Sequence, residues 1–466
     1  MLTETKTKNY LYFAPFFVLG MAVIPIVVAL FSGVSQNLYW DGDYAIFLID
    51  MHNASNFTQS LGISSRFGWA HPGPLNYYLL TPFYLASGRG TQSLMLGTLA
   101  LNLVCLFGTA VIIFRLANRV LAGVFLLVFV WFFVTALRSS ALWDVLVPFS
   151  TILPWVLAVF VACAVAVASY RWLPLLILTL CFLTQAHVSL WLPCTFIGIA
   201  STTLALCNRR LARSDLPWLV LAAAIAFILW VPPLLEWRNI VLIFRHFTEP
   251  SADAHSVSKA FRALTVLMGE SIAYSDSPAE NKYLALGLGL MLSTLPAIIK
   301  AVKTKNHFII ALGVLCFGSV AIFGLSLTRF TGPIMPHSIL FMATLGPIFL
   351  MLALSMVVQS TDFMTSLLIA SALIVLVAYK WQPISSAIHA AKTPDVAIQH
   401  LSALLADELH RHGQPQAVFI DHAVWPAAVG AVAQAYRNGE IFYILMLRSR
   451  AKLLKFCIGG SRCVDE

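Results

Sequence analysis

The sequence contains very little charge for its length. Of its 466 residues, 11% are charged and 59% are hydrophobic, whereas a soluble globular protein carries about 25% charged residues. This deficit excludes an ordinary soluble protein and predicts an all-α polytopic membrane protein. The formal net charge is +9, but the basic residues stand mostly in short loops between apolar runs, where they set membrane orientation. We therefore expect membrane lipids, and no nucleic acid, as partners.

The eight cysteines lack the spacing of a metal site. Cys457 and Cys463 stand in the C-terminal tail, where an extracytoplasmic location would permit a disulfide. The sequence leaves open whether these two cysteines pair. The other six lie in apolar runs and are expected to act as packing residues: Cys105, Cys163, Cys181, Cys194, Cys207 and Cys316.

Eleven hydrophobic runs are candidate membrane spans, and together they predict a transmembrane domain over residues 1–380. The first run is too long for a signal peptide and lacks a convincing cleavage site, so it is expected to remain as a span. The weakest predictions are the fifth and sixth runs, because both are short and almost no loop separates them. The runs cover residues 10–33, 91–114, 119–137, 150–169, 172–188, 189–207, 216–235, 282–300, 307–327, 338–358 and 364–380.

Basic residues in alternate loops orient the spans. The positive-inside rule places these loops and the N-terminus in the cytoplasm. Most acidic residues fall in the opposite loops, so the working surface is expected to face outwards. An odd number of spans then puts the C-terminus outside. The basic residues that give this orientation are Lys6, Lys8, Arg115, Arg119, Arg171, Arg209, Arg210, Arg213, Lys300, Lys303 and Lys305.

Two outer loops are long, residues 34–90 and 236–281. Both contain stretches with an apolar face and a polar edge, which predict helices lying in the membrane interface. The composition changes after residue 380. Residues 381–466 alternate helix and strand patterns, and they are expected to form a small extracytoplasmic α/β domain.

An acidic pair follows the first span, in W-D-G-D-Y at residues 40–44. The carboxylate of Asp41 or Asp43 can accept a proton from a sugar hydroxyl. The two together can also provide oxygen ligands for a divalent cation, the one cofactor that the sequence leaves open. The D-x-D spacing is a weak signal, and the bland alternative is that both residues only mark where the span leaves the membrane.

Further polar residues stand in the outer loops. Arg66 and His71, in S-R-F-G-W-A-H-P-G-P at residues 65–74, suit a phosphate or a hydroxyl, and Trp69 between them is a candidate for a substrate groove. Arg329 and His337 share a short outer loop and are candidates for holding an anionic headgroup. An arginine beside phenylalanine also snorkels at the interface, so both interpretations of Arg329 stay open.

Gln185 and His187, in L-T-Q-A-H-V, lie near the outer end of a span. Polar side chains within a span are functional candidates, and we assign both to the substrate groove. A hydrogen bond to a neighbouring helix is the alternative explanation for His187.

Several of these segments resemble the GT-C superfamily of integral membrane glycosyltransferases, and in particular a group of bacterial GT-C-like proteins. The segments are G-D-Y-A, S-R-F-G-W-A-H-P-G-P-L-N-Y-Y-L-L-T-P-F-Y and L-T-Q-A-H-V, within roughly the first 190 residues. The resemblance implies a polyprenyl-phosphate sugar donor and transfer outside the cytoplasm with inversion, in a bacterial inner membrane. It also implies that the first-loop aspartate, Asp43 or alternatively Asp41, is the general base.

The resemblance thus implies a hexosyl- or pentosyltransferase of the cell envelope, acting on a glycan, lipid or protein acceptor. A polytopic transporter or lipid-linked-glycan flippase is the main alternative. Such a protein needs ionisable groups or interrupted helices near the midplane, and the predicted spans contain almost no ionisable residue. A non-catalytic scaffold, in which the acidic loop is structural, is the third interpretation.

Overall fold

The structure is a computed structural model. It describes residues 14–65, 67–137, 139–249, 254–273, 280–330, 332–356, 363–390, 395–412, 416–421, 425–438, 442–447 and 453–456. Five residues singled out from the sequence lie outside these ranges: Lys6, Lys8, Arg66, Cys457 and Cys463.

Within these ranges, nine helices are long and apolar enough to cross a bilayer, and each follows one of the predicted runs. The chain is therefore a multi-pass membrane protein. The spans are built from α2 (Ala14–Phe31), α5 (Gln92–Leu116), α6 (Arg119–Trp131), α8 (Ile152–Val167), α10 (Trp191–Asn208), α11 (Leu216–Leu235), α14 (Glu280–Ser293) with α15 (Leu295–Thr304), α16 (His307–Leu327), and α18 (Leu345–Leu354).

The two remaining runs form helices that differ from simple spans. Helix α9 (Leu173–Ala186) has 14 residues, which rise about 21 Å, less than the roughly 30 Å of a bilayer core. Helices α19 (Phe363–Tyr379) and α20 (Trp381–Ala390) meet at 53°, and this bent pair can count as one further span. The described residues thus support nine or ten spans, where the sequence predicted about eleven.

The bundle is built around α8, whose span is 94% buried, whereas the span containing α11 is only 11% buried and lies at the periphery. Lipid tails are as apolar as the side chains, so helices in a membrane gain most from close packing, which small residues permit. Helix α13 (Val257–Glu270) and α14 show this. A Cβ at Gly269 would overlap the carbonyl oxygen of Tyr283, and one at Gly287 would overlap that of Thr265.

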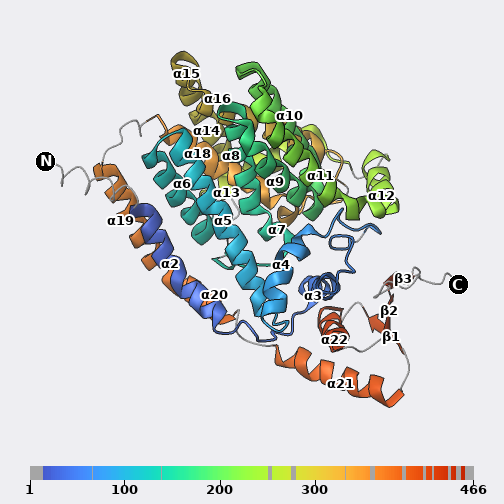
Figure 1. The fold of residues 1–466 in the computed structure, drawn as a ribbon. Coiled ribbons are helices and arrows are strands. Elements are labelled where there is room, and N and C mark those ends of the chain that lie inside the picture. The colour runs from blue at the N-terminus through green and yellow to red at the C-terminus, as the bar shows by residue number, and fades with distance from the viewer. Residues whose placement is uncertain are drawn as a thin grey trace.

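The two long loops that were predicted to face outwards contain helices; their position in the membrane interface stays a prediction. The first loop contains α3 (Gly42–Ser55) and α4 (Leu75–Ala86), and the second contains α12 (Trp237–Thr248) and α13. Figure 1 shows α3, α4 and α12 at the end of the bundle away from α15. The sequence pattern did not indicate α13 as a separate helix. Single turns complete the fold: α7 (Val147–Ser150), α17 (Pro336–Ile339), η1 (Phe132–Ala136), η2 (Ser139–Leu142), η3 (Tyr170–Trp172), η4 (Val188–Leu190), η5 (Arg213–Asp215) and η6 (Leu340–Thr344).

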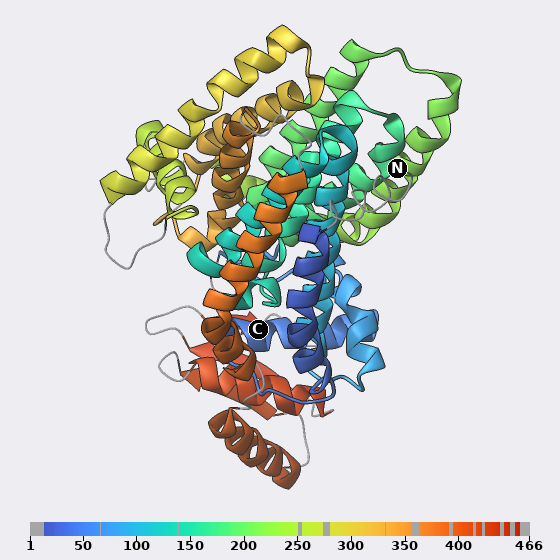
Figure 2. The same ribbon diagram turned by 90° about the vertical axis from the view of Figure 1, so that its left-hand side faces the viewer.

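The C-terminal segment contains α21 (Val396–His412), β1 (Gln416–Asp421), α22 (Trp425–Arg437), β2 (Phe442–Leu447) and β3 (Leu453–Phe456). Strand β2 lies between the other two and pairs parallel with β1 and antiparallel with β3. Helix α22 lies against α21 on one side and against α3 on the other, at the end of the bundle that carries the first outer loop (Figures 1 and 2). That residues 381–466 form a separate domain stays a prediction.

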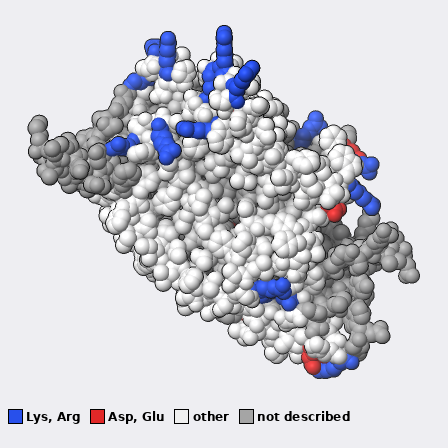
Figure 3. All heavy atoms as spheres, viewed as in Figure 1, with Lys and Arg blue, Asp and Glu red and all other residues white. Residues whose placement is uncertain are grey.

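Charge is distributed unevenly over the described surface. In the face that Figure 3 shows, lysine and arginine side chains gather at the upper end, around the tips of α10 and α15, and an uncharged band lies below them. The upper end contains the loops assigned to the cytoplasm by the positive-inside rule. The assignment of this end to the cytoplasm remains a prediction.

Candidate functional site

The acidic pair lies where the first outer loop enters α3. Asp41 occupies the N-cap position, with φ −111° and ψ 175° and no capping hydrogen bond from its side chain, and Asp43 stands in the first turn. Both side chains are exposed. A carboxylate is stabilised near a helix N-terminus by the helix dipole, so the fold holds two exposed acids at the end of the bundle away from α15.

The aromatic residues beside the pair connect it to the segment that precedes α8. The rings of Trp40 and Tyr44 lie 5.8 Å apart. The Tyr44 hydroxyl donates to Asp144 Oδ2 over 2.8 Å, and the backbone N–H of Leu146 donates to Asp144 Oδ1 over 3.0 Å. Asp144 was not among the predicted site residues, although it is an outer acid at the start of a span, and that position was the available signal.

A second group of predicted residues lies together around His71. The His71 ring is 4.4 Å from the His187 ring and 5.5 Å from the Trp69 ring. His187 Nδ1 lies 2.6 Å from Ser189 Oγ, and that hydroxyl donates to the carbonyl oxygen of Ser338, over 3.3 Å. His337, the neighbour of Ser338, is exposed on α17. The fold therefore brings three sequence-predicted histidine positions to one place.

The protonation state of His71 follows from its surroundings. The side chain is buried, and its Nδ1 accepts a hydrogen bond from the backbone N–H of Val188 over 3.3 Å. Burial, and secondly the nearby His187, lower the pKa of His71 well below its usual value. The ring is therefore neutral near pH 7 with its proton on Nε2. It can donate one hydrogen bond to a ligand, but it does not supply positive charge.

Backbone hydrogen bonds and the amide side chain of Asn239 hold the loop that carries Trp69 and His71. Gly62 N–H donates to the His71 carbonyl and His71 N–H to the Ile63 carbonyl, both over 2.9 Å. On α12, Asn239 bonds both backbone groups of Ala70: its Oδ1 accepts from the N–H over 2.8 Å, and its Nδ2 donates to the carbonyl over 2.9 Å. Nothing in the sequence pattern pointed to Asn239.

Gln185 supports the same loop from α9. Its side chain is only 1% exposed, and its Nε2 donates to the carbonyl of Leu229 over 2.7 Å. Its backbone carbonyl accepts from Gly73 N–H over 3.2 Å, and a Cβ at Gly73 would overlap the Gln185 side chain. Gln185 is thus buried and supports the turn before α4. Its predicted place in a substrate groove stays a prediction.

Arg329 is exposed. Its neighbour Phe330 packs with Phe247 at a ring distance of 6.2 Å, and Phe247 packs with Trp69 at 6.1 Å. Arg329 therefore borders the aromatic residues around the His71 group. The acidic pair is connected to this group only indirectly. Asp144 lies three positions before Val147, the first residue of α7, and α7 contacts α17, which carries His337.

The described residues do not form a complete metal site. Among them, no three or more histidine, cysteine, aspartate or glutamate side chains are placed to hold one ion. Asp41 and Asp43 supply two carboxylates, whereas Ca²⁺ or Mg²⁺ takes about six or more oxygen ligands.

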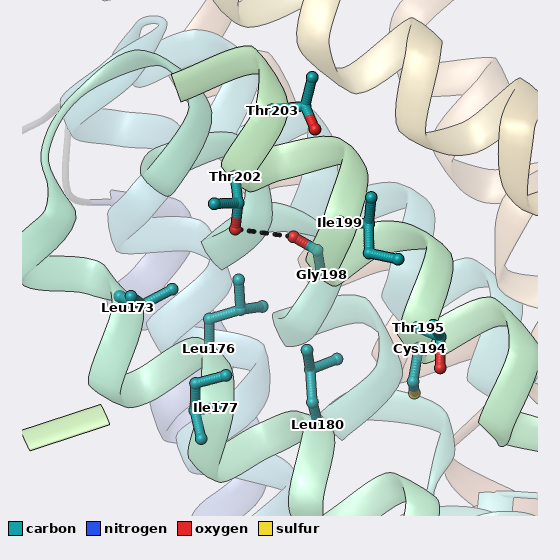
Figure 4. A pocket seen from close by; sticks show the side chains of 10 residues that line it. All are labelled: Leu173, Leu176, Ile177, Leu180, Cys194, Thr195, Gly198, Ile199, Thr202 and Thr203. Atoms are coloured by element: carbon teal, nitrogen blue, oxygen red, sulfur yellow. Dashed lines mark hydrogen bonds between the residues drawn. The ribbon is translucent and has the colours of Figure 1, made fainter. Parts of the chain in front are cut away.

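A large cavity lies away from both groups. It has a volume of about 470 Å³ and opens between α9 and α10, where leucine, isoleucine, cysteine, threonine and glycine line it (Figure 4). One of its hydroxyls is already used, since Thr202 Oγ1 donates to the Gly198 carbonyl over 2.8 Å. The lining contains no charged side chain. We therefore do not assign the reaction to this cavity.

Comparison with solved structures identifies the fold. The apo structure of ArnT from Cupriavidus metallidurans aligns with a TM-score of 0.55 at 11% identity, covering 92% of each chain. The chain is similar in fold to ArnT. The undecaprenyl phosphate complex of that ArnT aligns with a TM-score of 0.47 at 14% identity, covering 91% of this chain and 75% of ArnT. An Archaeoglobus fulgidus oligosaccharyltransferase aligns with a TM-score of 0.44 at 12% identity, covering 92% and 67%.

The similarity to ArnT confirms the predicted GT-C resemblance at the level of the fold. No protein-family profile and no curated protein matches the chain. At 11% identity the likeness extends to the path of the helices, and the roles of individual side chains must be argued from this chain's own geometry.

Proposed function

We propose that the chain is a membrane glycosyltransferase that moves a hexosyl or pentosyl unit from a polyprenyl-phosphate donor to a hydroxyl outside the cytoplasm. The observation that carries this proposal is the exposed pair Asp41 and Asp43 at the N-terminal turn of α3, in a chain with the fold of ArnT. The same ArnT has a structure with undecaprenyl phosphate bound, and we assign the donor to that lipid class. The acceptor is a glycan, a lipid or a protein.

Asp43 is the general base of the proposed reaction. Its carboxylate takes the proton of the acceptor hydroxyl, and the hydroxyl oxygen attacks the anomeric carbon. The bond between that carbon and the donor phosphate oxygen breaks, and the electron pair leaves with the polyprenyl phosphate. Attack from the opposite face inverts the configuration. A hydroxyl is a poor nucleophile until a base takes its proton, and such a base contributes about 10²–10⁴ in rate. Asp41 is the alternative base.

The leaving phosphate accumulates negative charge as the bond breaks, and donors aimed at that charge lower the barrier. We assign this role to Arg66, Arg329 and His337, with His71 donating from Nε2. Trp69 and His187 pack against the His71 ring, and we assign them to the groove that receives the sugar.

We further propose that the protein lies in a bacterial inner membrane with its N-terminus in the cytoplasm. Residues 1–380 would then form the transmembrane domain and residues 381–466 an extracytoplasmic unit beside the site. The concentration of basic side chains at the end of the bundle opposite α3 and α22 supports this orientation.

The test is sugar transfer by purified protein in liposomes, with radiolabelled polyprenyl-phosphate sugars as donors. Asp43→Asn should lower the transfer rate by about 10²–10⁴ with little change in the KM for the donor. Asp407→Asn changes an exposed acid on α21 and should retain the wild-type rate.

Two results would contradict the proposal. Wild-type transfer by both Asp43→Asn and Asp41→Asn would remove the acid pair from the mechanism. Movement of a fluorescent lipid-linked sugar across the liposome membrane, unaffected by Asp43→Asn and unaccompanied by transfer, would identify a transporter or flippase instead.

A further inference from the structure

The segment that carries the acidic pair is covered by a helix almost 400 positions later in the chain. Helix α22 packs along α3, where Ala45 and Ile49 share a buried cluster with Val429, Val432 and Ala433. The sequence shows that α3 and α22 each have an apolar face, but the apolar pattern does not indicate that these faces pair. The contact makes the C-terminal segment part of the surroundings of Asp41 and Asp43.

The N-terminal half of α22 supports the backbone of the acidic segment. A Cβ built on Gly42, the residue between the two acids, lies 3.9 Å from the Cβ of Pro426. A Cβ on Gly430 would lie 2.6 Å from the carbonyl oxygen of Trp40, which is closer than real Cβ atoms approach. Glycine at position 430 therefore lets α22 approach the backbone directly before Asp41.

The C-terminal end of α22 forms hydrogen bonds with both ends of the loop of residues 34–90. Arg437 Nη1 donates to Asn37 Oδ1 over 2.7 Å, and Arg437 Nη2 donates to the backbone carbonyl of Arg89. Asn37 follows α2, and Arg89 precedes α5. The neighbouring Tyr436 donates from its hydroxyl to Asn53 Oδ1, near the end of α3, over 2.7 Å.

These contacts constrain the acidic segment at both ends. A helix is a rigid element, and the 13 residues of α22 extend about 20 Å. The planar guanidinium of Arg437 presents donors in a fixed fork, and its position is half-buried, so its hydrogen bonds are shielded from water. Reaction geometry is sensitive to such support, because a displacement of about 1 Å can lower a rate on the order of 10²-fold.

We infer that α22 is a positioning element for the acidic pair, with Arg437 and Tyr436 as positioning residues that hold the first outer loop closed at its base. The inference on packing stands without the proposed glycosyltransferase activity, whereas its catalytic consequence rests on that activity. The C-terminal segment is then a required part of the site.

The packing is tested by a disulfide between positions 42 and 426. A Cβ separation of 3.9 Å falls within the 3.5–4.5 Å that disulfides require. The variant Gly42→Cys/Pro426→Cys should cross-link on mild oxidation in native membranes, which proteolysis between the two positions followed by electrophoresis detects. Gly42→Cys alone, Pro426→Cys alone, and the pair oxidised after SDS measure the background from native cysteines. Gly42 has φ +48°, at which an L side chain is strained, so Gly42→Cys alone must keep the wild-type melting temperature. With that control met, a pair that gives only the background yield would overturn the inference. If the control is not met, the kcat of Arg437→Gln decides.

The positioning role is tested by Arg437→Gln, Arg437→Lys and Tyr436→Phe, with Arg411→Gln as a matched control on α21. Arg437→Gln should lower kcat about 10-fold or more with little change in donor KM, and it should also lower the cross-linking yield of the 42/426 pair. Arg437→Lys should retain more of the kcat and of the cross-linking yield than Arg437→Gln, but less than the wild type. Lysine keeps the positive charge but lacks the planar guanidinium that donates to two acceptors at once. Arg411 is exposed and forms ion pairs with Asp407 and Glu408 of its own helix, so its variant should behave as wild type.

The outcomes separate the two proposals. Normal cross-linking with wild-type kcat in Arg437→Gln would refute the positioning role, whatever the reaction is. Efficient cross-linking that Arg437→Gln reduces, in a wild-type protein that transfers no sugar, would refute the proposed function and leave the α22 packing intact.

Discussion

At the scale of single residues, Asp50 is a half-buried acid in the loop of residues 34–90, and Tyr77 is the hydrogen-bond partner of its carboxylate. Asp50 lies two turns after Asp43 on α3, and its Oδ2 accepts a hydrogen bond from the Tyr77 hydroxyl over 2.8 Å. Burial raises the pKa of Asp50 from 3.8 to about 7, although the bond from Tyr77 acts in the opposite direction. Two acids on one helix thus have different environments, one in solvent and one against a phenol.

This pKa predicts a pH-dependent stability difference. The unfolded chain releases the Asp50 proton near pH 4, whereas the folded chain keeps it until about pH 7. Asp50 therefore favours the fold less as the pH rises through this window, and its effect levels off above it. Relative to Asp50→Asn, the melting temperature of the wild type should fall between pH 4 and pH 7 and stay constant above pH 7.

The comparison with Asp50→Asn is needed because His52 changes stability with pH in the opposite direction. Its pKa is lowered to about 4 by burial and by the nearby Arg89 and Arg437, so its contribution to stability is lost as the pH falls. Subtracting the two melting curves removes the His52 contribution. A difference that does not change with pH would show that Asp50 has an ordinary pKa.

At the scale of elements, α12 and the loop of residues 62–74 depend on each other. Asn239 is buried and satisfies both backbone groups of Ala70. His246, about two turns further along α12, lies 5.6 Å from the Trp69 ring. The helix therefore determines where Trp69 and His71 stand.

Replacing Asn239 by alanine should destabilise this loop. The backbone N–H and carbonyl of Ala70 would lose their partners, at a cost of about 1–3 kcal/mol for each group left unsatisfied. We expect a lower melting temperature and a lower transfer rate in Asn239→Ala. Arg238→Ala, which changes the exposed neighbour, should affect neither. Equal melting temperatures for both variants and the wild type would show that Asn239 does not support the loop.

The sequence predicted the positions of the helices more accurately than it predicted which distant residues contact each other. Apolar runs and loop charges indicate which segments enter the membrane, and D-x-D after a span is visible as a pattern. The contacts of Asp144 with Tyr44, of Asn239 with Ala70, and of Arg437 with Asn37 join residues between 100 and 400 positions apart. Periodicity shows which face of a helix is apolar, but it does not specify which distant side chain satisfies a polar group.

At the scale of the whole molecule, the account requires opposite ends of the bundle to face opposite compartments. Ser64 lies exposed in the first outer loop and Lys303 lies exposed on α15. In intact cells, a membrane-impermeant maleimide should label Ser64→Cys. It should label Lys303→Cys only after the membrane is opened.

The wild type measures the labelling of native cysteines in the same experiment. Labelling of Lys303→Cys, but not of Ser64→Cys, in intact cells would reverse the orientation and place the acidic pair in the cytoplasm. A polyprenyl-linked donor outside the cytoplasm would then be out of reach of Asp43.

The central claim is that Asp43 promotes breakage of the bond between sugar and lipid phosphate. The most direct measurement is a single-turnover experiment with a doubly labelled polyprenyl-phosphate sugar, following released lipid phosphate and glycosylated acceptor together. The wild type should form both in equal amounts, with inverted anomeric configuration, and Asp43→Asn should form both about 10²–10⁴ times more slowly. Equal rates in the two proteins, or retention of configuration, would contradict the account.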